Sequence, residues 1–248
     1  MQTSNFWLDR HEAEQCYDSF EHFYNQYVQI PGGKVENPQL YPFQKRFVQQ
    51  MMESRYLIGT KFRNGGFTTT TLAYVLWLSL FRQDQRIMFL TGSAREAIYY
   101  CGMFDRMCER LPKWIQCTNE RNLATVRHWA ETNSKVSFNK AEASRGIALT
   151  HVFIDEAAFI KDMDQHWKAM YPVIATGGKC VAISTPNKTQ GWFYETYEDA
   201  IHGMNCFKVF HTHVREHPYW TPERLALAKK NMEPYAFNQE IMQGFHVN

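Results

Sequence analysis

Several features that mark particular protein classes are missing from this sequence. Its longest uncharged apolar stretch, residues 72–81, is too short to span a bilayer, which needs about 20 residues. The first turns carry Asp9, Glu12 and Glu14 and show no basic-then-apolar signal peptide. Lys and Arg number 27 against 25 Asp and Glu, and a net charge of +2 does not by itself indicate a nucleic-acid or membrane partner. We therefore expect a soluble intracellular protein that does not contact a membrane.

Cysteine is sparse and scattered along the chain. The six cysteines form no CxxC pair, and this spacing in 248 residues predicts reduced thiols and not a disulfide or zinc framework. Glycine (13) and proline (9) are few, while aromatic residues make up 15% of the chain. This composition argues against disorder and predicts a folded protein of one or two domains.

Apolar segments that fit strands alternate with longer segments that fit helices. Segments 123–130 and 135–139 fit a hairpin, and Thr221-Pro222 fits the N-cap of a final helix. The alternation predicts an α/β fold with a mainly parallel central sheet and helices on both faces, and ligands in such sheets bind beyond the carboxyl ends of the strands. The expected strands are 56–59, 86–91, 151–155, 180–184 and 207–213, and the expected helices are 44–52, 68–82, 94–110, 162–174 and 191–201.

Residues 8–28 precede this alternation and fit one amphipathic helix. Its aromatic stripe is most simply a packing face, and the break at Pro31-Gly32-Gly33 then separates it from the main body. We therefore expect an N-terminal helical appendage over residues 1–35 and one main domain over residues 36–248.

The segment between the first expected strand and its following helix has the composition of a phosphate-binding loop. Such a loop needs glycine for tight curvature, a lysine on the phosphates and a hydroxyl on Mg²⁺. Against the pattern GxxxxGK[ST], Gly66 and Thr68 fit, but Phe67 takes the place of the lysine and Lys61 that of the first glycine. Either Lys61 supplies the charge, with Arg63 as a second cation, or the loop has lost phosphate binding and is only a turn.

The strand 151–155 ends in two adjacent carboxylates, Asp155 and Glu156. An Asp at a strand end can hold the Mg²⁺ of a nucleotide, and the following Glu is suited to act as a general base on an attacking water. The alternative is the acidic start of a helix, since Ala157-Ala158-Phe159 follows.

Two further segments gain meaning from this order. The strand 180–184 ends in Ser184-Thr185-Pro186-Asn187, where Thr185 or Asn187 could hydrogen-bond a terminal phosphate or the attacking water; a chain-reversing turn is the alternative. Upstream, Gln44 lies near a helix start, and its amide offers the donor and acceptor that could recognise adenine.

These elements occur in the order and spacing of the ATPase domain of tailed-bacteriophage terminase large subunits. The sequence resembles that family from Leu40 to its C-terminus, and the combination is more specific than any single motif. Besides Gln44, the loop and the Asp155-Glu156 strand, the resemblance rests on Ala143-Ser144-Arg145-Gly146, Ser184-Thr185-Pro186-Asn187, Gly191-Trp192-Phe193-Tyr194 and Phe237-Asn238-Gln239-Glu240.

The resemblance implies an additional-strand P-loop NTPase with a deviant Walker A loop and a Walker B strand. It implies a viral motor that hydrolyses ATP with Mg²⁺ to drive double-stranded DNA into the procapsid. The implied partners are double-stranded DNA, the portal protein, the small terminase subunit and further copies of the chain in a ring on the portal. The implied location is the host cytoplasm and, transiently, the portal vertex of the procapsid.

The resemblance also implies roles for individual residues. Glu156 would be the catalytic carboxylate, with a catalytic arginine from Arg63 in cis or from Arg145 in trans. Thr68 and Asp155 would hold Mg²⁺. Gln44 would contact adenine, Ser184, Thr185 and Asn187 would sense the γ-phosphate and couple it to motion, and the loop residues Lys61, Arg63, Asn64, Gly65, Gly66, Phe67, Thr68 and Thr69 would bind ATP.

Two alternatives compete with this motor. A helicase-like nucleic-acid ATPase also joins an adenine-reading glutamine to such a strand but normally brings a second motor domain. A degenerate loop in an assembly module without turnover is the non-enzymatic alternative, and Phe67 is its best support. Whole terminases also carry a C-terminal nuclease domain; we find no room here for its acidic metal cluster, so we expect no nuclease activity from this chain.

Two other patterns have less specific meaning. His211, His213 and His217 could ligate a metal, but a surface or interface strand is the simpler interpretation because no further ligand lies beside them. A stretch with Arg106, Arg110, Lys113, Arg121, Arg127 and Lys135, interleaved with Trp114 and Trp129, fits either a DNA-tracking face or an ordinary solvated surface.

Overall fold

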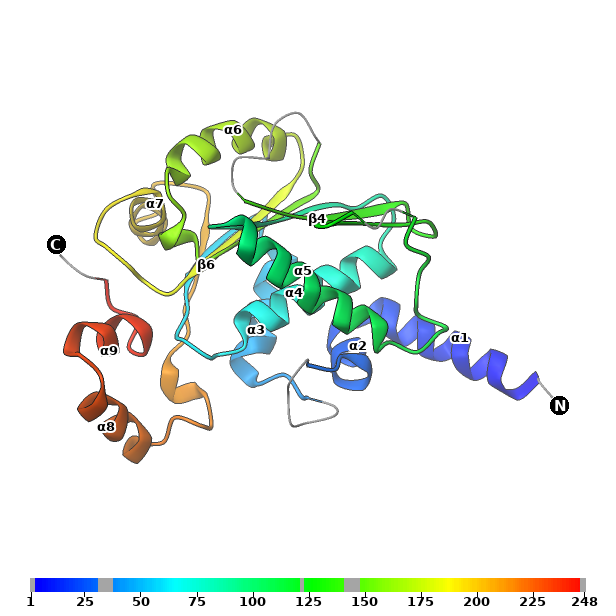
Figure 1. The fold of residues 1–248 in the computed structure, drawn as a ribbon, viewed down its shortest axis with the longest axis horizontal. Coiled ribbons are helices and arrows are strands. Elements are labelled where there is room, and N and C mark those ends of the chain that lie inside the picture. Colours follow the sequence, from blue (N-terminus) through cyan, green and yellow to red (C-terminus); the bar gives the residue numbers. More distant parts are fainter. Residues whose placement is uncertain (1–2, 31–37, 121–122, 141–147, 246–248) are drawn as a thin grey trace.

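A seven-stranded sheet organises the molecule, and its strand order is β3-β4-β2-β5-β6-β1-β7 (Figure 1). The computed structural model describes residues 3–30, 38–120, 123–140 and 148–245. Every neighbouring pair of strands is parallel except the β3–β4 hairpin at one edge, which the sequence predicted. The strands are β1 (Tyr56–Thr60), β2 (Arg86–Thr91), β3 (Val126–Trp129), β4 (Ser134–Lys140), β5 (His151–Asp155), β6 (Lys179–Ser184) and β7 (Lys208–Phe210).

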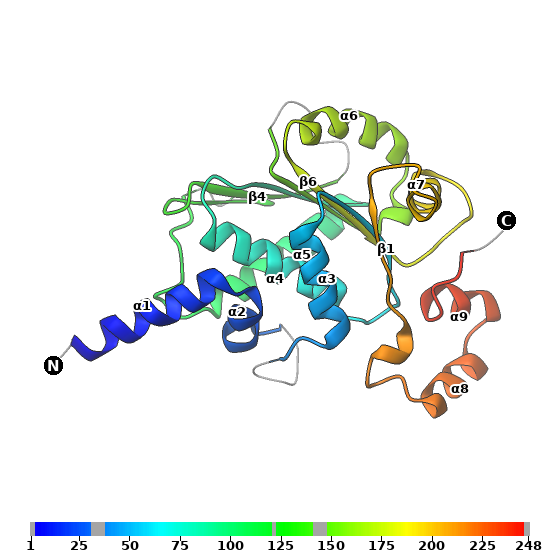
Figure 2. The ribbon, with the colours of Figure 1, turned by 180° about the vertical axis from the view of Figure 1, so that it is seen from behind.

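Helices cover both faces of this sheet, as predicted (Figures 1 and 2). Because side chains alternate along a strand, Leu57 packs with the helices of one face and Ile58 with those of the other. One face carries α1 (Thr3–Asp18), α2 (Phe20–Tyr27), α3 (Pro42–Glu53), α4 (Phe67–Phe81) and α5 (Ala94–Glu109); the other carries α6 (Met163–Ala175) and α7 (Trp192–Ile201); α8 (Pro222–Asn231) and α9 (Pro234–Glu240) follow β7.

The strand β6 lies between β1 and β5, which is the arrangement of an additional-strand P-loop NTPase. Thr60 at the end of β1 pairs with Ser184, and Asp155 at the end of β5 pairs with Ile183. Because all three strands are parallel, the residues that follow them emerge at the same edge of the sheet. The topology therefore brings together the three strand ends that the sequence analysis singled out.

The N-terminal segment differs from the single helix expected over 8–28. The chain breaks at Ser19, whose backbone is extended and whose side chain caps α2 by accepting from the His22 N–H. The predicted packing face is confirmed for Phe20 and Phe23, which are buried in the same core as α4. The domain boundary at residue 35 stays a prediction, and the Pro31-Gly32-Gly33 break lies outside the described residues.

The last expected strand is shorter than predicted. β7 covers only Lys208–Phe210, because His213 instead caps a short 3₁₀ helix, η3 (Val214–Glu216), by accepting from the Arg215 N–H. The cap at Thr221 is confirmed, since its hydroxyl accepts from the Arg224 N–H at the start of α8. None of the helices in the described segments is long and apolar enough to cross a membrane.

Candidate nucleotide-binding site

The loop between β1 and α4 turns sharply at the edge of the sheet. Asn64 (φ 61°) and Gly66 (φ 74°) both adopt the left-handed conformation. A side chain on Gly66 would also bring its Cβ to 2.6 Å from Gln44 Nε2, so glycine is required there on two counts. The loop leads directly into α4, which begins at Phe67 with Gly66 as its N-cap.

Lys61 lies at the centre of a buried polar cluster. Its Nζ is 2.6 Å from Asp155 Oδ1 and 3.1 Å from Glu156 Oε1, and it donates to Thr68 Oγ1 at 3.3 Å. Burial lowers the pKa of this ammonium, but the two carboxylates outweigh burial and the pKa is raised. Lys61 is therefore a charged group fixed at the loop, although it stands outside the usual lysine position.

Thr68 and Asp155 meet as the resemblance implied. Thr68 Oγ1 donates to Asp155 Oδ2 at 2.6 Å, and the Lys61 ammonium lies against the same two side chains. A carboxylate and a hydroxyl that already surround a cation are the hard oxygen donors that Mg²⁺ prefers. The residues present fit a magnesium site.

Glu156 links the loop to the end of β6. It adopts a left-handed backbone (φ 51°), which is strained for a residue other than glycine. Its Oε1 faces Lys61, while its Oε2 accepts from the backbone N–H and the hydroxyl of Thr185, both at 3.2 Å, and from the Ser184 hydroxyl at 3.4 Å. One carboxylate thus contacts both the expected phosphate site and the expected coupling segment.

The third coupling residue has a different contact. Asn187 Nδ2 donates to the Ala158 carbonyl at 3.3 Å, and Ser184 Oγ accepts from the Ala158 N–H at 3.2 Å. Both residues therefore brace η2 (Ala157–Phe159), the short 3₁₀ turn that follows Glu156. The predicted acidic start of a longer helix is replaced by this turn.

A cavity of about 600 Å³ opens over these groups. Three residues of its wall were missed from the sequence: Glu96, Tyr99 and Tyr100, all on α5. The signal was available, since α5 follows the carboxyl end of the parallel strand β2 and its first turns must lie at the same edge. The wall is formed by residues 61–69, Glu96, Tyr99, Tyr100, Glu156 and Thr185.

Phe67 explains why the loop can lack the usual lysine. Its side chain is 2% exposed and packs in a group of aromatic rings. The ring centroids of Phe43, Phe47, Phe62 and Phe210 all lie between 5.5 and 5.8 Å from that of Phe67. The residue at the lysine position is a core residue that anchors α4, and the charge comes from the other end of the loop.

Gln44 contacts the loop itself. Its Nε2 donates to the Gly65 carbonyl at 2.9 Å, and its Oε1 accepts from the Tyr41 N–H at 3.0 Å. The amide therefore braces the loop and the start of α3 together. Its predicted contact with adenine stays a prediction.

Arg63 lies at the mouth of the cavity with its side chain 56% exposed. Its guanidinium is 3.4 Å from Glu240 Oε2 and 4.0 Å from Glu156 Oε1, and its N–H donates to the Glu240 carbonyl at 2.7 Å. Glu240 was missed as a site residue because the fold alone brings α9 against the loop. Arg145, the alternative arginine, lies outside the described residues.

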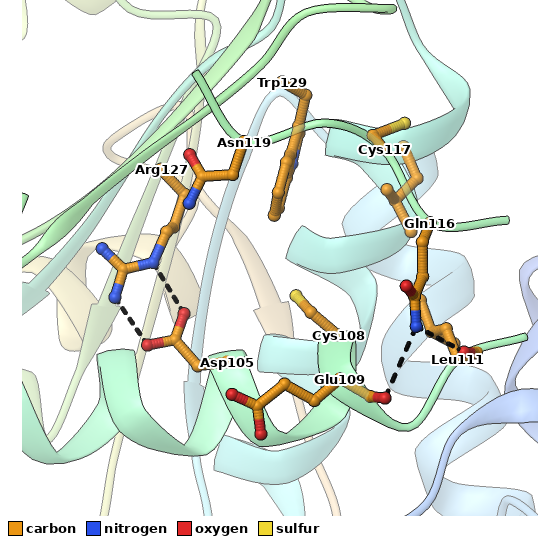
Figure 3. Close-up of a pocket in the computed structure, with 10 residues that line it drawn as sticks. Asp105, Cys108, Glu109, Leu111, Gln116, Cys117, Asn119, Arg127 and Trp129 are labelled. Atoms are coloured by element: carbon orange, nitrogen blue, oxygen red, sulfur yellow. Dashed lines mark hydrogen bonds and ion pairs between the residues drawn. The ribbon is translucent and has the colours of Figure 1, made fainter. Parts of the chain in front are cut away.

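The basic stretch contains two residues that cannot form a DNA-tracking face. Arg127 and Trp129 are buried, and Arg127 forms an ion pair with Asp105 through two bonds of 2.7 and 2.5 Å beside a cavity of about 240 Å³ (Figure 3). Arg106, Arg110 and Lys113 are exposed, and Arg121 lies outside the described residues.

The three histidines of the HxHxxxH pattern act separately. His213 caps η3, and His217 Nδ1 accepts from the Tyr219 N–H at 3.1 Å. His211 lies within hydrogen-bond distance of the Tyr197 hydroxyl. Among the described residues they form no group that could hold a metal ion, so the simpler interpretation is favoured.

The strand order and the loop at the end of β1 define the chain as a P-loop NTPase-like α/β protein. A family model described as "Terminase large subunit, T4likevirus-type, N-terminal" matches residues 63–236, well over half of the sequence. The chain belongs to this family of terminase large subunits.

Solved structures of phage terminases share the fold. The large terminase ATPase domain of Thermus phage P74-26 matches with a TM-score of 0.67 and 17% identity, covering 84% of this chain and 94% of that one. The HK97 bacteriophage large terminase gives 0.74 and 14%, covering 92% and 55%. The large terminase of a thermophilic bacteriophage, in complex with ATP-gamma-S, gives 0.64 and 13%, covering 81% and 51%. The chain thus spans about half the length of the last two proteins.

Proposed function

We propose that this chain is the ATP-hydrolysing motor domain of a terminase large subunit and drives double-stranded DNA into a procapsid. The observation that carries the proposal is the joint placement of Lys61, Thr68, Asp155 and Glu156 at one cavity of about 600 Å³. Family membership supports it, as does the large terminase of the thermophilic bacteriophage that binds ATP-gamma-S. The family match also favours the motor over the helicase-like alternative.

In this proposal Lys61 and the loop hold the phosphates, while Thr68 and Asp155 hold Mg²⁺. The bound Mg²⁺ would supply neutralisation of the charge that develops on the phosphate oxygens. Lys61 already carries the positive charge needed for this contact and would exchange its carboxylate partners for phosphate oxygens. Phosphoryl transfer requires mainly such positioning and charge, which this cluster provides.

Glu156 would orient the attacking water and accept its proton. Its second oxygen is bound to Ser184 and Thr185, so a shift of the carboxylate during turnover would change the contacts at the end of β6. This connection is the physical basis for assigning a coupling role to Ser184 and Thr185. Arg63 is placed to add positive charge in cis, and Arg145 from a neighbouring copy is the alternative.

The wider assembly is part of the same proposal. The partners would be double-stranded DNA, the portal protein, the small terminase subunit and further copies of this chain in a ring on the portal. The site of action would be the host cytoplasm and the portal vertex of the procapsid. If a neighbour supplies the catalytic arginine, the isolated chain turns over ATP slowly and assembly raises the rate.

The test is a calorimetric titration of ATP into the chain with and without Mg²⁺, followed by phosphate release from motors assembled on DNA-packaging procapsids. We expect saturable binding that tightens with Mg²⁺, and phosphate release that depends on assembly. Absence of saturable ATP binding would contradict the proposal and favour the degenerate-loop assembly module. Binding without phosphate release in assembled motors would contradict the hydrolytic role.

A further inference from the structure

A second polar cluster lies between α1 and α2, near the opposite end of α4 from the nucleotide loop (Figure 2). Glu12 and Cys16 are four residues apart on α1, so they share one helix face. The break at Ser19 turns the chain so that α2 brings His22 to the same place. In the described part of the chain this is the one group in which a carboxylate oxygen, a thiol sulfur and an imidazole nitrogen all lie within 4.8 Å of one another.

Each of the three side chains is held by a further contact. The Cys16 carbonyl accepts from Trp77 Nε1 at 2.7 Å, which fixes this turn of α1 to α4. Glu12 Oε1 accepts from the Tyr27 hydroxyl at 2.8 Å. The Ser19 hydroxyl holds the backbone N–H of His22 at 3.1 Å. Outer hydrogen bonds of this kind orient the ligands of metal sites in proteins.

Burial also differs across the cluster in a way that suits an ion entering from solvent. Cys16 is fully buried, whereas the side chains of Glu12 and His22 keep 28% and 27% of their exposure. The sulfur therefore lies at the base of the cluster, and the oxygen and nitrogen lie toward the surface. The two outer side chains have room to adjust.

We propose that Glu12, Cys16 and His22 bind one zinc ion, with a water molecule as the fourth ligand. A thiolate, an imidazole and a carboxylate are the three ligand types that zinc takes in proteins. On binding, the Cys16 thiol releases its proton to solvent, and the two negative ligands then balance the two charges of the ion.

The present distances are compatible with this ion. Bonds of about 2.0–2.3 Å to a tetrahedral zinc place neighbouring ligand atoms roughly 3.3–3.8 Å apart. Glu12 Oε1 and His22 Nε2 are now 2.6 Å apart in a hydrogen bond, so they must separate by about 1 Å. The ion would replace that hydrogen bond and link α1 to α2 across the break at Ser19. This zinc site is independent of the proposed ATPase activity.

The first test uses cobalt as a spectroscopic probe on the full chain after treatment with a chelator. We expect one Co²⁺ per chain, with a sulfur-to-cobalt charge-transfer band and the visible bands of tetrahedral cobalt, and both should disappear when Zn²⁺ is added. Cys16→Ala should abolish the charge-transfer band. Cys180→Ala is the matched control, since Cys180 is equally buried, and it should keep the band. Absence of the band in the unaltered chain would overturn the proposal.

The second test keeps the proposal falsifiable if Cys16→Ala does not fold. His22→Gln changes a partly exposed side chain and should weaken zinc binding by at least about a hundredfold, because it removes a direct ligand. Zinc should raise the melting temperature of the unaltered chain and not that of His22→Gln, while ATP affinity stays the same in both. Equal zinc affinity in the two proteins would contradict the assignment.

Discussion

Two cavities of this fold hold a buried cation against a carboxylate, and they differ in what else the cation contacts. At the nucleotide cavity, Lys61 lies 2.6 Å from Asp155 and also reaches Glu156 and Thr68. In the cavity of Figure 3, Arg127 forms two bonds to Asp105, and its remaining contacts are backbone carbonyls of its own hairpin region. Lys61 is surrounded by groups that suit a phosphate and a metal, whereas Arg127 is surrounded by structure.

The difference shows that position in the topology, and not burial, separates a functional ion pair from a structural one. Lys61 directly follows a central parallel strand, at the edge where ligands of such sheets bind. Arg127 lies on β3, the antiparallel strand at the far edge of the sheet. The first cavity measures about 600 Å³ and the second about 240 Å³, so only the first has room for a nucleotide. Changes at the two sites should therefore have opposite profiles.

The largest effect is expected from Glu156→Gln. The amide keeps the size of the side chain and its contact with Thr185 but cannot accept a proton, so turnover in assembled motors should fall by about 10²–10⁴-fold. ATP affinity should remain near that of the unaltered chain. Phosphate release and a parallel ATP titration measure the two quantities. Turnover retained in assembled motors would rule out the role of Glu156 as general base.

Arg127→Met should act on stability alone. Removing the cation leaves Asp105 without its partner and should lower the free energy of unfolding by about 2–3 kcal/mol, less than for a fully buried pair because 30% of the Asp105 side chain is exposed. Urea denaturation gives this value. The double change with Asp105→Leu is the control and should recover part of the loss, while ATP affinity stays constant in both variants. A loss of ATP affinity would show that the contrast between the cavities is wrong.

Lys61→Ala should have the opposite profile and weaken ATP binding by about tenfold to a hundredfold. This range corresponds to roughly 1.4–2.7 kcal/mol, the size of a charge-assisted hydrogen bond to phosphate. Calorimetric titration in the presence of Mg²⁺ measures it, and Arg127→Met serves as the matched control with a buried cation removed elsewhere. If ATP affinity is unchanged, Lys61 does not replace the missing loop lysine.

Gln44→Leu should give the smallest change. It removes the bonds to Gly65 and Tyr41 and should lower the free energy of unfolding by about 1 kcal/mol. If the amide also contacts adenine, ATP affinity should fall more than GTP affinity, which we expect. Titrations with both nucleotides compare the two effects. Equal losses for ATP and GTP would show that Gln44 only braces the loop.

Much of the fold could be predicted because its strands are apolar and its loops carry clear signals. The strands 86–91 and 151–155 have the predicted bounds. The N-terminal helix was the main exception, because hydrophobic periodicity continues across Ser19. The local competition between helix continuation and a serine cap was decided by the packing of α2 on α4, which periodicity does not report.

The site could be predicted only where residues follow strands directly. Asp155 and Glu156 are of this kind, since topology alone fixes where they lie. The burial of Phe67 among rings from distant segments, and the contact of Glu240 with Arg63, depend on tertiary packing. No spacing in the sequence encodes these contacts, so they had to come from the structure.

The central claim is that Lys61 takes the place of the missing loop lysine. A crystal structure of the Glu156→Gln variant with Mg²⁺ and a non-hydrolysable ATP analogue tests it most directly. We predict that Lys61 Nζ leaves Asp155 Oδ1, now 2.6 Å away, and hydrogen-bonds a phosphate oxygen, while Thr68 and Asp155 ligate the metal. A structure in which Lys61 stays on Asp155 and other residues hold the phosphates would contradict the account.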